Sequence, residues 1–151
     1  RNFSPLLGLN MTLKKNISIT FRHNRNKSLD ESQNGMTIHS DNSYTSTGTY
    51  THRGGLKIPI PYYGVVNMNN TMSFTLNFDM NESSEERSGD KVNFETGSFS
   101  ESWKAGLRVS YQFNTKVSGG IRYEYRENDS RTTGKKVDRD FGFDVNIAIS
   151  G

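Results

Sequence analysis

The chain has 151 residues, a formal net charge of +3 and no cysteine, and 31% of its residues are apolar or aromatic. Ser, Thr and Asn together make 47 residues while Ala occurs twice, so strong helix formers are scarce and a helical bundle is excluded. The length suits one domain, residues 1–151, and the mild positive charge gives no reason to expect a nucleic-acid partner.

The first predicted elements are two strands, over 5–13 and 17–27. Their apolar residues alternate with polar ones, and this period of two is typical of strands with one apolar face and one polar face. The alternating apolar residues are Leu7, Leu9, Met11, Leu13, Ile17, Ile19 and Phe21. A third, weaker strand is predicted over 36–52, where Met36, Ile38, Tyr44 and Tyr50 share even positions.

The segment from Leu56 to Ile60 also alternates, but Pro59 and Pro61 remove two backbone donors. We expect an extended connection or an edge there, not a central strand.

Four more strands are predicted over 70–82, 99–113, 117–128 and 138–149. The alternation is strongest here, as in Met72, Phe74, Leu76, Phe78 and Met80 around polar residues. No window approaches the ~18 consecutive apolar residues of a transmembrane helix. No signal peptide stands at the start, and because residue 1 is Arg we expect a processed chain or an excised fragment.

The connections differ between the two ends of the predicted sheet. Residues 14–16 and 114–116 are short turns at one end, whereas 28–35, 83–98 and 129–137 read as longer polar loops at the other. Short turns on one rim and long loops on the other are typical of bacterial outer-membrane barrels. Aromatic residues near strand ends would suit an interfacial girdle, namely Phe21, Phe113, Tyr123, Tyr125 and Phe141.

We therefore predict an all-β fold, an antiparallel up-and-down transmembrane β-barrel segment in the bacterial outer membrane. The apolar side chains would contact outer-membrane lipid: Leu9, Met11, Ile19, Phe74, Leu76, Phe78, Leu107, Val109, Ile121, Phe143, Val145 and Ile147. The charged side chains of the other face would line the lumen: Asp79, Lys104, Arg108, Arg122, Glu124 and Asp144. A lumen with mixed charges suits a water-filled conduit for protein and not a selective ion filter.

Two alternatives remain. A soluble antiparallel sandwich or barrel that binds a ligand would also alternate, although strands of about 12 to 15 residues exceed the usual ~5–6. The second alternative is a self-contained or oligomeric porin-like barrel. Seven strands are fewer than the ~8 of the smallest closed barrel, so we expect the remaining strands to come from elsewhere in a larger barrel.

Five segments of the chain form a distinctive set of motifs, namely Phe3-Ser4-Pro5-Leu6-Leu7-Gly8-Leu9-Asn10, Lys14-Lys15-Asn16-Ile17-Ser18, Asn26-Lys27-Ser28-Leu29, Gly55-Leu56-Lys57-Ile58-Pro59-Ile60 and 143–149. These segments resemble the carboxyl-terminal part of the Sov/SprA family, the outer-membrane translocon barrels of the type 9 secretion system. Its specific part covers about the first 60 residues. The segment 30–35 is shorter than in that pattern, and a terminal Phe is missing. The resemblance implies a wall of a large protein-export pore, with secreted cargo and accessory translocon subunits as partners.

Candidate chemistry is sparse. A turn at 28–35 would pair His23 with His39, and with Asp41 they form a weak metal candidate. Two groups of carboxylates could in principle bind calcium: Glu82, Glu85, Glu86 and Asp90, and those of Asp138-Arg139-Asp140. Their spacing matches no calcium-binding loop, so we expect them to lie in solvated loops and not in a calcium site.

Lys135, Lys136 and Arg139 lie on the predicted long-loop rim, where lipopolysaccharide phosphates would be, although a solvated loop is the better explanation. No nucleophile–His–acid arrangement and no phosphate-binding glycine motif occurs. We expect no catalysis, no metal and no cofactor.

Overall fold

The computed structural model describes residues 2–13, 16–32, 35–62, 64–89 and 93–148. The strands are β1 (Asn2–Leu13), β2 (Ile17–Ser32), β3 (Gly35–Arg53), β4 (Leu56–Ile60), β5 (Gly64–Met68), β6 (Thr71–Ser88), β7 (Glu95–Gln112), β8 (Val117–Ser130) and β9 (Gly134–Ile147). Within these ranges no helix is long and apolar enough to cross a membrane.

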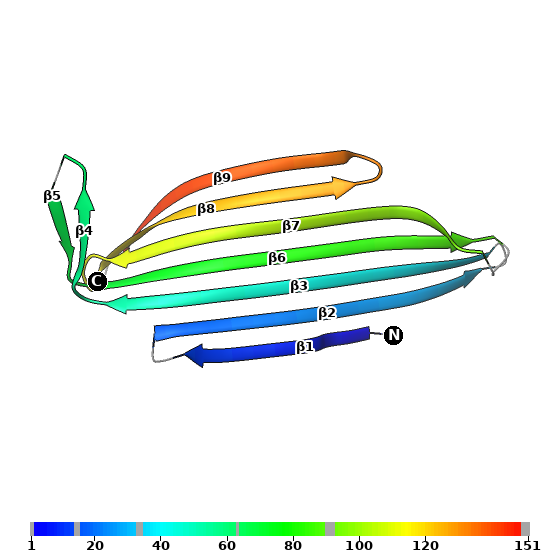
Figure 1. Cartoon of the computed structure of the whole chain (residues 1–151), viewed down its shortest axis with the longest axis horizontal. Helices are drawn as coiled ribbons and strands as arrows, with labels where there is room; N and C mark the ends of the chain where they lie inside the picture. The colour runs from blue at the N-terminus through cyan, green and yellow to red at the C-terminus, as the bar shows by residue number, and fades with distance from the viewer. Residues whose placement is uncertain (1, 14–15, 33–34, 63, 90–92, 149–151) are drawn as a thin grey trace.

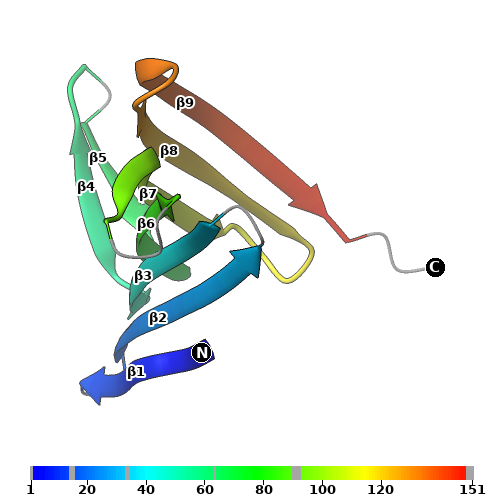
Figure 2. The ribbon, with the colours of Figure 1, turned by 90° about the vertical axis from the view of Figure 1, so that its right-hand side faces the viewer.

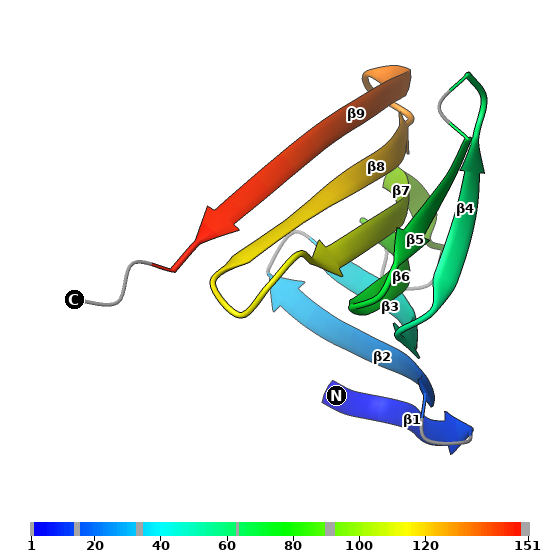
Figure 3. The ribbon, with the colours of Figure 1, turned by 90° about the vertical axis from the view of Figure 1, so that its left-hand side faces the viewer.

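Seven of the strands form one antiparallel sheet in the order β1-β2-β3-β6-β7-β8-β9, and β4 and β5 form a separate hairpin (Figure 1). Viewed along the strands, the sheet is a single curved and twisted layer with β1 and β9 at its two ends (Figures 2 and 3). The predicted all-β fold with seven long antiparallel strands is confirmed. The sheet is open, so the structure holds a curved wall and no closed cylinder.

The strands extend further than the alternation predicted. Residues 28–32, 83–88, 95–98 and 134–137 were expected in long loops, but they continue β2, β6, β7 and β9 as paired strands, with one shift of the β6–β7 register between Glu85 and Glu86. The predicted long loops are therefore wrong. Both faces are polar over 83–88 and 95–98, and the other two extensions hold one apolar residue each, Leu29 and Val137. None of the four therefore shows the repeated period-two hydrophobic pattern by which a sequence reveals a strand.

The β4–β5 hairpin leaves the main sheet between β3 and β6, at the end where the chain also turns from β1 to β2 and from β7 to β8 (Figure 1). Its register pairs Leu56 with Met68 and Pro59 with Val65. The prediction that the proline-containing segment stays out of the sheet centre is confirmed, and the missing donors of proline explain why. At the hairpin tip, Tyr62 has a positive φ of 72°.

Pro5 lies in β1, at the edge of the main sheet. The β1–β2 register shifts between Phe3 and Leu7, a stretch that includes Pro5. Because proline cannot donate to a ladder, edge strands and bulges are the places in a sheet that tolerate it.

The sheet has no covered core. Among the side chains that the structure describes, Met72 is the single buried apolar one. The accessible surface is 11240 Å², whereas a compact soluble protein of this mass exposes roughly 7,800 Å². A lone sheet with an uncovered apolar face is not stable in water, so another medium or another layer must cover that face.

Candidate functional site

The two faces of the main sheet differ completely in chemistry. Residues directly opposite in an antiparallel ladder share a face, so each row can be followed across all seven strands. One such row consists of Leu13, Ile17, Tyr50, Phe74, Val109, Ile121 and Phe143. We call the face that holds this row the apolar face and the opposite one the polar face.

Large apolar side chains occupy a band on the apolar face, which we call the belt. It covers 7–13 of β1, 17–23 of β2, 44–52 of β3, 72–80 of β6, 103–111 of β7, 119–127 of β8 and 137–145 of β9. On β6 this is nine residues, Met72 to Met80, against the ~9–11 that a tilted strand needs to cross a bilayer. Most of its large apolar side chains are exposed, as in Leu76 at 61% and Phe143 at 81% accessible, although Met72 at one margin is buried.

The belt ends at the same level on neighbouring strands. The next row of the apolar face changes abruptly to Arg25, Asn42, Glu82, Glu101, Asp129 and Lys135. Just inside this boundary lie Tyr44 and Trp103, while Tyr111 occupies the opposite margin of the belt. Trp103 packs against Tyr125 with ring centroids 4.8 Å apart, and His23 stacks on Tyr44 at 4.3 Å.

The polar face carries only polar residues and glycine over the height of the belt. Its charged side chains there are five cations and five anions, so this part of the described structure has no net charge. The cations are Arg22, Lys104, Arg108, Arg122 and Arg126, and the anions are Asp79, Glu124, Asp138, Asp140 and Asp144. Over β2, β3 and β6 the face is mostly Ser, Thr and Asn, with neutral contacts such as Thr47 Oγ1 to Asn77 Oδ1 at 3.1 Å.

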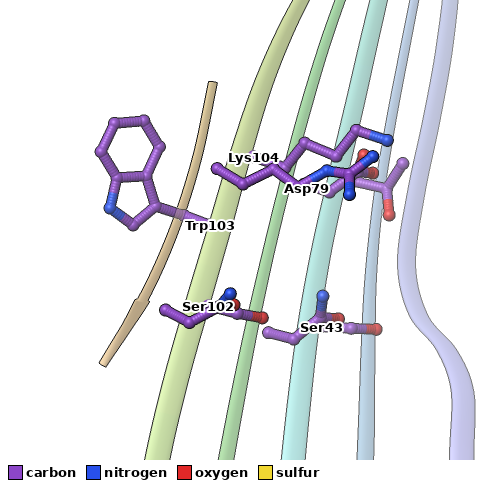
Figure 4. Close-up of a pocket in the computed structure, with 9 residues that line it drawn as sticks. Ser43, Asp79, Ser102, Trp103 and Lys104 are labelled. Carbon is purple, nitrogen blue, oxygen red and sulfur yellow. The ribbon is translucent and has the colours of Figure 1, made fainter. Parts of the chain in front are cut away.

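Ion pairs join the charged strands of the polar face. Lys104 Nζ lies 2.9 Å from Glu124 Oε2, and Arg126 contacts the same carboxylate. Arg108 Nη2 lies 3.1 Å from Asp144 Oδ1. A groove of about 320 Å³ runs beside Asp79 and Lys104, where both side chains point to one side of the sheet and Trp103 points to the other (Figure 4).

Every side chain predicted to contact lipid lies on the apolar face, and every one predicted to line the lumen lies on the polar face. The sequence did not single out Tyr44 and Trp103 as margin residues. Of the aromatics proposed for a girdle, Tyr123 and Phe141 lie in the middle row of the belt, beside Leu107. The margins of the belt are rows of residues that run across neighbouring strands. They can therefore be located only when the strand register is known, and alternation within one strand does not give that register.

The predicted pairing of His23 with His39 is wrong. His23 lies opposite Tyr44, and His39 lies opposite Ser28, because β2 continues to Ser32 before the chain returns. His39 instead lies 3.5 Å from carboxylate oxygens of both Asp30 and Glu85. No group of three or more His, Cys, Asp or Glu side chains able to hold a metal occurs in the described ranges.

The acidic clusters are divided by the strand geometry. Asp138 and Asp140 lie on the polar face beside Lys136 and Arg122, at 3.4 and 3.6 Å, while Arg139 between them lies on the opposite face. Glu85 contacts Arg87 on the polar face, whereas Glu82 and Glu86 lie on the other. Asp90 falls outside the described residues. The expectation that these carboxylates lie in solvated loops is therefore wrong for those in β6 and β9. They belong to strands, and their side chains are divided between the two faces of the sheet.

The three basic residues singled out near the rim also separate. Lys136 is on the polar face, whereas Lys135 and Arg139 are on the apolar face. Lys135 Nζ lies 2.5 Å from Glu127 Oε1, and this hydrogen bond raises the pKa of Lys135 above its usual value. The Arg139 guanidinium lies over the Tyr125 ring, 5.8 Å from its centroid.

Comparisons of the chain with protein-family models, with curated proteins and with solved structures give no match.

Proposed function

We propose that the chain forms part of the wall of an outer-membrane β-barrel, with the apolar face against lipid and the polar face against a water-filled lumen. The observation that carries this proposal is the belt, which spans seven residues on β1 and β2 and nine on the other five strands, and which ends on one side at a mostly charged row. On the strands where the belt has nine residues, eight steps of about 3.3 Å give about 26 Å along the strand, or about 20 Å along the membrane normal at a tilt of ~40°. Outer-membrane barrels have an apolar band ~25 Å tall.

The exposure of the belt supports a lipid-facing role over a soluble binding module. A soluble sandwich would bury this face against a second sheet, yet Leu76 and Phe143 are more than half exposed. Trp103 and Tyr44 lie at a margin of the belt, and amphipathic aromatic rings are favoured at that level of a membrane interface.

The edges of the sheet favour a larger barrel over a self-contained one. Inside a bilayer, unpaired backbone groups on β1 and β9 would cost several kcal/mol each, so both edges need partner strands. With seven antiparallel strands, β1 and β9 point the same way. Direct closure, or a head-to-tail ring of copies, would join them in parallel. Antiparallel closure, as in outer-membrane barrels, requires an odd number of further strands.

The polar face supports passage of protein. Five cations balance five anions over the height of the belt, and ion pairs on β7, β8 and β9 satisfy several of them. A charge-balanced wall neither selects ions nor holds a charged polypeptide strongly. Together with the resemblance to the type 9 translocon family, this leads us to propose a protein-export channel.

Deletion of the gene in the producing bacterium tests the export function. Loss of the channel should leave secreted proteins in the periplasm, and the wild-type gene should restore their release. If the deletion strain secretes the same proteins and loses only the uptake of small solutes, the channel is porin-like and not an export channel.

A further inference from the structure

The belt is not uniformly filled. A groove of about 450 Å³ crosses the apolar face near its middle, from Ile19 on β2 to Tyr125 on β8. It exists because Ser46, Gly48 and Ala105 are small where their neighbours Leu76, Phe78 and Leu107 are large. A Cβ atom built on Gly48 would meet nothing within 4 Å.

A positively charged side chain, that of Arg139, lies beside this groove. Arg139 is in the same row as Phe78, Ala105 and Tyr125, and its guanidinium lies over the Tyr125 ring that also lines the groove. It is exposed, and Glu127 is the only other charged side chain among the described belt positions of the apolar face. That carboxylate is held by Lys135 Nζ at 2.5 Å and by the Tyr125 hydroxyl at 2.9 Å.

We infer that the apolar face holds one phosphorylated anionic lipid, with an acyl chain in the groove and the phosphate on Arg139. This inference rests on the proposed lipid-facing role. A guanidinium facing hydrocarbon is unfavourable unless its long side chain reaches the interface or pairs with an anion. Its planar fork of donors matches a phosphate, and the Tyr125 ring holds it beside the groove. Charge complementarity and an apolar groove thus select the same kind of occupant.

The single tryptophan of the chain reports directly on this groove. Trp103 packs against two groove residues, with ring centroids 6.4 Å from Phe78 and 4.8 Å from Tyr125. The experiment reconstitutes the complete barrel that contains the chain, with any tryptophan outside the chain replaced by phenylalanine, in phosphatidylcholine vesicles. A small fraction of a lipid with brominated acyl chains, which quench tryptophan on contact, is then added. One arm uses brominated phosphatidylglycerol, and the other uses brominated phosphatidylcholine.

We expect the anionic lipid to quench Trp103 at a several-fold lower mole fraction than the zwitterionic lipid. Arg139→Gln should abolish this preference, and Gly48→Leu, which fills the groove, should weaken quenching by both lipids. Arg122→Gln, on the polar face of the neighbouring strand, is the matched control and should leave the preference unchanged. Equal quenching by both lipids in the unsubstituted chain, or a preference that survives Arg139→Gln, overturns the lipid site while leaving the lipid-facing role intact. Absence of quenching by either lipid overturns the lipid-facing role as well.

Discussion

Trp103 and Lys104 are neighbours in β7, yet they belong to different environments. The Trp103 ring packs on Tyr125 at 4.8 Å between centroids, while Lys104 Nζ contacts Glu124 Oε2 at 2.9 Å on the other side of the sheet. Figure 4 shows the Trp103 and Lys104 side chains on opposite sides of the sheet. Their partners Tyr125 and Glu124 are likewise neighbours in β8, so one pair of strands presents an aromatic cluster to one face and an ion pair to the other. The same division on all seven strands is the basis of our account.

Replacement of Leu107 by Arg tests which face contacts lipid. Leu107 lies in the middle row of the belt, and Arg near the bilayer midplane costs about 2–4 kcal/mol. We expect Leu107→Arg to lower the free energy of unfolding in lipid vesicles by that amount, measured by urea titration. The matched control is Ser110→Arg on the polar face of the same strand, which should change it by about 0.5 kcal/mol or less. Equal losses in the two variants would contradict the assignment of the faces.

Gly35 is held in a conformation that other residues rarely adopt. Its φ is +138°, and a Cβ built there would lie 2.2 Å from the backbone oxygen of Ser88. Gly35→Ala should therefore destabilise the β2–β3–β6 end of the sheet by about 1–3 kcal/mol. Hydrogen exchange of the amides of β3 near Gly35 measures this, with Gly48→Ala as the control because its Cβ has free space. Equal protection in both variants would show that this end tolerates the strain.

The Arg108–Asp144 pair joins strands that are not adjacent, β7 and β9, across β8. A double-mutant cycle with Arg108→Ala and Asp144→Ala should give a coupling of about 0.2–1 kcal/mol, because both side chains are partly exposed. If water reaches this face, the coupling energy should decrease when the salt concentration is raised from 0.05 to 0.5 M. A coupling that does not respond to salt would mean that water does not reach this face.

The sequence was sufficient for some features of this fold and not for others. Alternation from Met72 to Met80 identifies a two-faced strand, because each apolar side chain alternates with a polar one. The same strand continues to Ser88, but beyond Glu82 both faces are polar and the pattern disappears. Register was the second difficulty. A turn placed a few residues too early paired His23 with His39, whereas the true ladder pairs His23 with Tyr44.

The most direct test of the central claim uses the absence of cysteine from the chain. Leu76 and Asn77 are consecutive in β6 and lie on opposite faces, and Leu76 is 61% exposed in the protein alone. In outer membranes, a membrane-impermeant maleimide should label Asn77→Cys through the lumen and leave Leu76→Cys unlabelled, since lipid covers it; in detergent-free urea both should react. Rapid labelling of Leu76→Cys in the intact membrane, with Asn77→Cys slower, would contradict the account.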